Sequence, residues 1–268
     1  DESETHFLLG KLYLNAKDYK RAIREYKKVI KIDSQNTMAY LYLGSLYAET
    51  KRYDWALEVI NKMLEIEPDH YLGHYYQAKI YVELKNLEAA EKGFIKTLSL
   101  KPGFEAAMVD LVTIYEKQKK FDKALETYKR YILLYPLKIN VRLKMVDLLF
   151  REHKYDQAEK AIKDILELDS RNKDVRLSLV SIYLERKNYT QAIQILNDVI
   201  KEDAQDFRIR FILGSVYEEI KDYSRALNEF RMIPETSEFY VPARIHMGII
   251  LKKEGKLESA ITHVHEAL

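Results

Sequence analysis

The chain has 268 residues, with 44 Lys and Arg against 42 Asp and Glu, so its formal charge at neutral pH is only +2. Non-specific binding to phosphate backbones relies on a strong basic excess, so this balance excludes nucleic acid as the expected main partner. The absence of cysteine excludes disulfides, thiolate nucleophiles and cysteine-ligated zinc. No apolar run approaches the roughly 20 residues of a membrane-spanning helix. We therefore expect a soluble chain without direct membrane insertion, with the cytoplasm and the periplasm both open as compartments.

An alanine recurs every 34 residues along the whole chain. Its eight positions are Ala22, Ala56, Ala90, Ala124, Ala158, Ala192, Ala226 and Ala260. A fixed period of this length is typical of repeat architectures. It predicts a single domain over residues 1–268, made of eight repeats of which the last is incomplete: 3–36, 37–70, 71–104, 105–138, 139–172, 173–206, 207–240 and 241–268.

Each repeat reads as a helix pair. In the second repeat, residues 37–49 and 53–66 carry apolar side chains at helical spacing, and Pro68 ends the second pattern. Glycines such as Gly10 and Gly44, twelve positions before the alanine, let two helix backbones approach closely. One pair this short cannot bury both of its apolar faces, so the pairs are expected to stack into an all-α solenoid.

The repeated residues resemble a known family. Leu43-Gly44, Tyr47, Ala56 and Pro68 are similar in type and spacing to the tetratricopeptide repeat, and the residues around Gly10 and Ala22 repeat the match. The resemblance covers essentially the whole chain. It implies a right-handed superhelical solenoid of antiparallel helix pairs, which acts as a scaffold or adaptor for other proteins.

The turn between the two helices departs from the family pattern. Where the family usually has glycine, six repeats have lysine: Lys17, Lys51, Lys85, Lys119, Lys187 and Lys221. If the backbone there is left-handed, each lysine costs about 1 kcal/mol relative to glycine.

The chain's last two repeats also differ from the others. Pro234 is expected to end the second helix of the seventh repeat early, and Pro242 suits the first turn of the next helix, so we expect a longer linker. The eighth repeat stops at Leu268 without a polar capping helix. Either the natural chain continues, or this end is a further contact surface.

The sequence lacks the usual catalytic and phosphate-binding motifs, so we expect no enzyme activity and no cofactor. His70 and His74 are four residues apart, a spacing that could bring two imidazoles to one metal ion. However, His70 falls in the loop before the helix and His74 occupies a packing position, so we expect no metal site there. His263, His265 and Glu266 could also form a weak metal-ligand group, but residues two apart on a helix point in different directions. We therefore interpret them as part of an exposed polar helix.

The resemblance implies that the first helix of each repeat lines the concave face, which is the expected binding surface. An apolar column there consists of Phe7, Leu41, Tyr75, Val109, Leu143, Leu177 and Phe211, and the positions four residues later include Lys11, Ser45, Lys79 and Thr113. Tyr42 and Tyr76 adjoin the column and, with Tyr75, are the best contact candidates. Packing between adjacent first helices is the alternative explanation for any single residue of the column.

We therefore expect a partner protein or peptide segment with apolar side chains, bound as an amphipathic helix or an extended strand. The family's carboxylate clamp is not matched, because its lysine place holds Phe7, Leu41 and Tyr75. The alternative is that the chain is the recognition arm of a larger enzyme or of an envelope or secretion assembly machine, with the chemistry outside residues 1–268.

Overall fold

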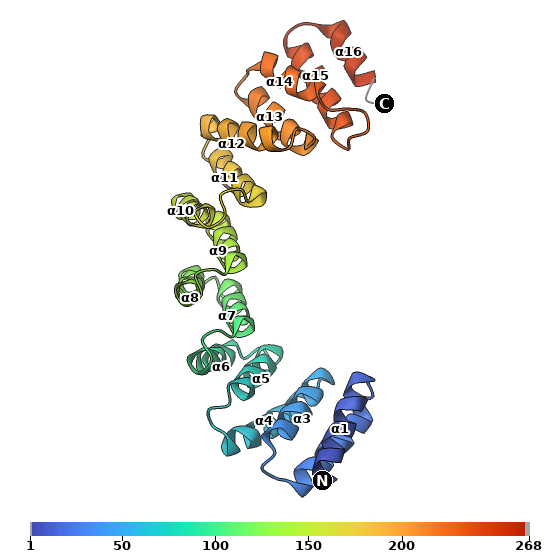
Figure 1. Cartoon of the computed structure of the whole chain (residues 1–268), viewed down its shortest axis with the longest axis vertical. Helices are drawn as coiled ribbons and strands as arrows, with labels where there is room; N and C mark the ends of the chain where they lie inside the picture. The colour runs from blue at the N-terminus through green and yellow to red at the C-terminus, as the bar shows by residue number, and fades with distance from the viewer. Residues whose placement is uncertain (1, 266–268) are drawn as a thin grey trace. The chain divides into compact units, whose positions relative to one another are not determined.

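The computed structural model describes residues 2–265, which form sixteen α-helices and no strand. In chain order (Figure 1) the helices are α1 (Glu2–Asn15), α2 (Tyr19–Ile32), α3 (Thr37–Glu49), α4 (Tyr53–Ile66), α5 (Tyr71–Glu83), α6 (Leu87–Leu100), α7 (Glu105–Lys117), α8 (Phe121–Leu134), α9 (Ile139–Arg151), α10 (Tyr155–Leu166), α11 (Lys173–Glu185), α12 (Tyr189–Glu202), α13 (Phe207–Glu219), α14 (Tyr223–Arg231), α15 (Tyr240–Lys253) and α16 (Leu257–His265). The prediction of an all-α repeat fold is confirmed, and α3 and α4 have the predicted bounds.

Two compact units make up the chain, Asp1–Val141 and Arg142–Leu268. In the first unit each helix from α1 to α8 packs on the next. The two helices of one repeat are in more extensive contact than the helices of successive repeats. In the second unit α10 to α16 pack in the same consecutive way. That residues 1–268 form one continuous solenoid stays a prediction.

The small-residue columns lie where helices pack most closely. Seven of the eight periodic alanines are fully buried, and Ala260 is 5% exposed. A β-carbon added to Gly10 would lie 2.8 Å from the Tyr26 ring, and one added to Gly44 would lie 2.6 Å from Ile60 Cδ1. The sequence-based expectation of a close backbone approach is therefore confirmed at these positions.

The turns between paired helices have a left-handed backbone. Positive φ angles occur at all six turn lysines, at His153 in the fifth repeat and at Gly255 in the eighth. In the second repeat the amide of Lys51 donates to the Ala48 carbonyl at 2.9 Å, and the amide of Arg52 donates to the Tyr47 carbonyl at 2.8 Å. This pair of bonds satisfies carbonyls at the end of α3 in the manner of a Schellman motif, which explains why the turn keeps this conformation without glycine.

The linker before the last repeat is longer than its counterparts, as predicted. Helix α14 has nine residues and ends at Arg231, and α15 begins at Tyr240 with Pro242 in its first turn. Pro234 follows the end of α14. Because proline has no amide hydrogen to donate, the helix could not continue through this residue without losing a hydrogen bond.

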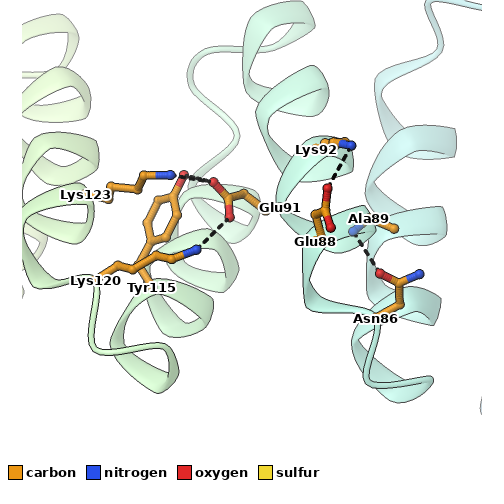
Figure 2. A network of polar contacts seen from close by, with 8 residues as sticks. All are labelled: Asn86, Glu88, Ala89, Glu91, Lys92, Tyr115, Lys120 and Lys123. Carbon is orange, nitrogen blue, oxygen red and sulfur yellow. Dashed lines mark hydrogen bonds and ion pairs between the residues drawn. The ribbon is translucent and has the colours of Figure 1, made fainter.

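A partly buried carboxylate joins the third and fourth repeats. Figure 2 shows Tyr115, Lys120 and Lys123 converging on Glu91, with hydrogen bonds of 3.1 Å from the Tyr115 hydroxyl and from Lys123 Nζ. Burial alone would raise the pKa of Glu91, but the hydrogen bonds from Lys123 and Tyr115 outweigh it and hold the pKa below its ordinary value. The same burial, together with the bond to Glu91, raises the pKa of Tyr115 to about 12.

The second unit repeats this arrangement around Glu159. The Tyr183 hydroxyl donates to Glu159 at 3.1 Å, and Arg186 donates to the same carboxylate at 2.8 Å. Because the tyrosine comes from the first helix of the following repeat, each carboxylate ties two successive repeats together.

The turn conformation predicts a stabilising substitution. Lys85→Gly is expected to raise the free energy of unfolding by about 0.5–1 kcal/mol, because the left-handed cost of lysine is partly offset by the larger conformational entropy that glycine loses on folding. Lys129→Gly, at an exposed position inside α8, is the control and should lower it by about 1 kcal/mol. Urea unfolding followed by circular dichroism measures both, and a loss of stability in Lys85→Gly would contradict the argument.

The network around Glu91 predicts a pH-dependent effect. At neutral pH, Glu91→Gln should lower the free energy of unfolding by about 1–2 kcal/mol, since hydrogen bonds to a charged acceptor are lost. The pKa of Glu91 is depressed in the folded state, so the carboxylate stabilises above its unfolded pKa of about 4.3 and this contribution disappears as the pH falls through the folded pKa. Unfolding of wild type and variant should therefore converge in acid.

Glu88→Gln is the matched control for Glu91→Gln. Glu88 lies one turn away on α6, its side chain is 82% exposed, and it pairs with Lys92 at 3.1 Å. An exposed pair of this kind contributes less than about 0.5 kcal/mol. If both variants lost the same free energy of unfolding, the network around Glu91 would stabilise the fold no more than an exposed ion pair does.

Candidate functional site

A cleft lies over the first helices of the first three repeats. It has a volume of about 570 Å³ and is lined by α1, α3 and α5, with the starts of α2 and α4 at one end. We call it the first-helix groove, and its lining residues are Leu14, Tyr19, Ser45, Leu46, Ala48, Glu49, Lys51, Tyr53, Tyr76, Lys79, Ile80 and Glu83. Three of the predicted contact residues, Ser45, Tyr76 and Lys79, therefore lie in one cleft.

Aromatic rings pack beside this groove. The Phe7 and Tyr42 rings are 5.6 Å apart edge to face, and Tyr42 stacks on Tyr26 with centroids 5.3 Å apart and planes at 7°. Tyr26 is fully buried, and its hydroxyl has no hydrogen-bond partner within residues 2–265. Burial, followed by the neighbouring Tyr42, raises the pKa of Tyr26 and also that of Tyr76. The hydroxyls of Tyr26 and Tyr76 therefore remain neutral donors at physiological pH.

Tyr75 and Tyr76, adjacent in the sequence, have different roles. The Tyr75 hydroxyl donates to Asp110 Oδ2 of α7 at 3.0 Å, and its ring lies 4.9 Å from Phe104. Lys79 Nζ approaches the same Asp110 carboxylate at 3.5 Å. Burial and the nearby carboxylate raise the pKa of Tyr75. Tyr75 thus braces α5 against α7, whereas the Tyr76 side chain faces the groove.

The remaining predicted residues of the first unit divide between packing and surface. Leu41 is only 6% exposed and belongs to the core, as the packing explanation of the column allows. Val109 is partly buried, while Lys11 and Thr113 are exposed. The hydroxyls of Ser45 and Thr113 donate to carbonyls of their own helices, at 2.9 Å to Tyr42 and 2.9 Å to Val109. Neither hydroxyl is committed to another helix.

In the second unit the predicted residues are Leu143, Leu177 and Phe211, all partly buried. The Phe211 ring packs among Phe230, Phe239 and His246, with centroid distances of 5.7, 5.6 and 5.4 Å. Phe211 is therefore mainly a packing residue.

A cleft of about 460 Å³ lies between α13 and α15, five repeats after the first-helix groove and at equivalent positions. Its lining residues are Ser215, Glu218, Glu219, Lys221, Tyr223, His246 and Lys253. His246 Nδ1 lies 2.6 Å and Lys253 Nζ 3.1 Å from the Glu218 carboxylate. Burial would raise the pKa of Glu218, but these two partners outweigh it and lower it. The same geometry thus carries a charged cluster here and tyrosine in the first unit.

Several groove residues were missed by the sequence-based prediction. Glu49, Lys51 and Glu83 line the first-helix groove, so its edge carries charges and not only the small polar groups expected. The Tyr53 hydroxyl donates to Glu83 at 3.2 Å. The role of Asp110 as a partner of Tyr75 was also missed. The sequence offers a signal for it, because Asp110 is the first charged residue in the column that holds Leu8, Tyr42 and Tyr76 in the preceding repeats.

The histidines noted in the sequence have local structural partners. His70 caps α5 by accepting from the Gly73 amide at 3.2 Å, and His74 Nε2 lies 2.8 Å from the Pro68 carbonyl. His263 contacts Arg244 at 2.9 Å, while Glu266 falls outside the described residues. Within residues 2–265 no group of three acidic or histidine side chains is arranged to hold a metal ion. Every helix in that range is too short or too polar to cross a bilayer.

The last helix has an exposed apolar side. Leu257, Ile261 and Val264 of α16 are 59%, 51% and 44% exposed. Residues 266–268 lie outside the described part of the chain. The predicted contact surface at the eighth repeat stays a prediction.

Solved structures with the same fold include several repeat proteins. The crystal structure of MamA protein is 23% identical over 65% of this chain and 94% of that chain, with a TM-score of 0.54. A tetratricopeptide repeat protein from Parabacteroides merdae ATCC 43184 is 15% identical over 97% of this chain and 99% of that chain, with a TM-score of 0.53. The structure of Naa15/Naa10 bound to HypK-THB is 14% identical over 100% of this chain and 39% of that chain, with a TM-score of 0.62. At these identities the likeness shows the fold.

Family comparison agrees with the fold. No curated protein matches the sequence. One tetratricopeptide repeat family model matches residues 13–80 and 149–210, and a second one matches residues 106–137. Together these segments make up more than half of the chain, and they contain five of the periodic alanines, Ala22, Ala56, Ala124, Ala158 and Ala192. The chain belongs to the tetratricopeptide repeat family.

Proposed function

We propose that the chain is a protein-interaction scaffold that binds a partner segment with apolar side chains in the first-helix groove. The observation that carries the proposal is an open cleft of about 570 Å³ beside a cluster of tyrosines. The hydroxyls of Tyr42 and Tyr76 form no hydrogen bond within residues 2–265, in contrast to the hydroxyl of Tyr75. Tyrosine combines apolar area with a donor at low entropic cost, as binding surfaces favour.

The groove chemistry favours a segment with alternating apolar and polar groups. Leu14, Leu46 and Ile80 supply apolar walls, and Tyr76 supplies a ring with a free hydroxyl. An extended segment presents backbone carbonyls that can accept from such hydroxyls while its apolar side chains enter the cleft. Glu49 and Lys51 lie at the edge, where they select against segments with unmatched charges.

The predicted contact residues contribute unequally to this proposal. In this proposal Ser45, Tyr76 and Lys79, which line the groove, contact the ligand together with the neighbouring Tyr42, while Tyr75 and Leu41 support the helices behind them. The remaining candidates, from Val109 onward along the chain, extend the proposed surface beyond the groove. No catalytic arrangement is part of the proposal, and the function is binding.

A second proposal is that this groove serves as the recognition arm of a larger assembly. The likeness to the structure of Naa15/Naa10 bound to HypK-THB favours it, because this chain spans only 39% of a longer chain that is part of that complex. The test is to purify the protein encoded by the full reading frame and to analyse the proteins that copurify with it. Partners in fixed stoichiometry indicate a subunit of a larger assembly, and purification of the protein alone indicates a free adaptor.

Changes in the groove should weaken peptide binding without unfolding the protein. The probe is a phage-displayed library of unstructured peptides of about 12 residues, from which binders are synthesised and titrated by calorimetry. Tyr76→Ala is expected to weaken binding by about tenfold or more, the loss typical of a buried aromatic anchor. Tyr76→Phe should give a smaller loss of about fivefold, since a hydrogen bond contributes about 1 kcal/mol.

Trp55→Ala is the control for these variants. Trp55 is an aromatic residue of α4 that is 52% exposed and lines a different cleft. Its removal should leave affinity unchanged. Selected peptides that bind Tyr76→Ala and a Tyr42→Ala variant as tightly as wild type, with circular dichroism intact, would refute the placement.

A further inference from the structure

A second cleft lies between the second helices α6 and α8, with α7 as its floor. It has a volume of about 450 Å³. We call it the α6–α8 cleft, and its lining residues are Ile95, Leu98, Ser99, Pro102, Met108, Leu111, Tyr115, Lys123, Glu126, Thr127, Arg130, Tyr131 and Leu134. None of them belongs to the first-helix groove.

The chain contains an internal reference for this cleft. Two repeats earlier, α2 and α4 enclose a smaller cleft of about 310 Å³, and its nine lining residues are the equivalents of nine in the α6–α8 cleft. Lys27 of the smaller cleft stands where the larger one has Ile95. Glu58 and Lys62 are paired at 2.8 Å in the smaller cleft, whereas their equivalents Glu126 and Arg130 form no ion pair within residues 2–265.

Two exposed apolar residues of this region stand where the other repeats have polar residues. Ile95 is 47% exposed, and its equivalents in the other repeats are Lys27, Asn61, Lys129, Lys163, Asn197, Arg231 and His265. Leu133 is 82% exposed, and its equivalents are Lys31, Glu65, Ser99, Glu167, Lys201 and Glu235. Leu134, beside it, is 57% exposed and lines the cleft. Exposed apolar groups clustered in this way mark an interaction surface.

The charges of the cleft are divided between its two ends. At one end Glu91 holds Lys123 and Tyr115 (Figure 2), so neither side chain is free to pair with a ligand. Arg130 and Glu126, one turn apart on α8, form no ion pair within residues 2–265, so the cleft offers one unpaired charge of each sign. A ligand that fills the apolar middle would therefore place a carboxylate near Arg130 and keep its other acidic groups away from Glu126.

We propose that the α6–α8 cleft binds an amphipathic helix of a partner protein, whose apolar side chains pack between Ile95 and Leu134 and whose acidic side chain pairs with Arg130. The lining residues recur at helical spacing, Ile95, Leu98 and Ser99 on α6 and Lys123, Thr127 and Arg130 on α8. Two such ridges with a helix as floor form a groove that a fourth helix fills. This site goes beyond the proposed function, because it lies on the second helices.

A helical probe tests the proposal directly. The probe is a phage-displayed library of alanine-based peptides of about 16 residues, long enough to form a helix on binding. Selection on the intact chain should enrich apolar residues at helical spacing together with Asp or Glu. In titrations of a synthetic winner, Ile95→Lys and Arg130→Glu should each weaken binding by about tenfold or more. A peptide with its acidic residue changed to Lys should recover affinity for Arg130→Glu.

The variants are matched to positions where the chain already tolerates the change. Ile95→Lys introduces the residue type that Lys27 supplies at the equivalent place, so folding should persist, as circular dichroism can verify. Lys62→Glu, the equivalent of Arg130→Glu in the smaller cleft, should leave affinity unchanged. Tyr76→Ala should also leave it unchanged, which separates this site from the first-helix groove.

Three outcomes would overturn the proposal. The first is that selected peptides bind Ile95→Lys as well as wild type, or that no helical peptide depending on Ile95 is recovered. The second is that charge reversal in the peptide fails to restore binding to Arg130→Glu. The third is that the intact chain self-associates in sedimentation and Ile95→Lys abolishes this, since the occupant would then be a second copy.

Discussion

The structure depends on the close approach of paired helices at small residues. The periodic alanines are buried to 5% exposure or less, and Gly10 and Gly44 leave no room for a β-carbon against Tyr26 and Ile60. Interiors at this packing density tolerate little change in volume. Because each contact recurs every 34 residues, it imposes the same local geometry on every repeat, including its turn and the clefts on either side.

That uniform geometry makes differences between repeats informative. The first-helix groove and the cleft between α13 and α15 use equivalent positions, yet one presents Tyr76 and the other His246 and Glu218. The two clefts between second helices differ in the same way at Lys27 and Ile95. Because these residues occupy equivalent positions of the repeat, each substitution changes the chemistry that its cleft presents.

Buried charges in this protein are structural. Glu91 and Glu159 each accept a tyrosine hydroxyl from the following repeat, and their partners keep them ionised despite burial. Each of these carboxylates accepts hydrogen bonds from side chains of the following repeat, so it ties successive repeats together. Asp110 also links successive repeats, with Tyr75 and Lys79 of the preceding repeat as its partners.

The fold could be predicted from the sequence in unusual detail, because its determinants are local and repeated. The alanine spacing indicated the helix pairs, and Pro234 indicated the early end of α14, whereas the left-handed backbone at the turn lysines was only a condition that the structure then met. Each of these follows from the conformational preference of one residue or from contacts within one repeat.

The candidate sites required the tertiary structure. Sequence columns placed Tyr75 and Tyr76 together as contact residues, but only the packing of α5 against α7 decided that one hydroxyl is committed to Asp110 while the other is free. Likewise, Ile95 and Leu134 lie far apart in the sequence and line one cleft only because α7 holds α6 and α8 on either side of it. Periodicity determines which face a residue occupies within its helix, but exposure and pairing depend on side chains that neighbouring repeats supply.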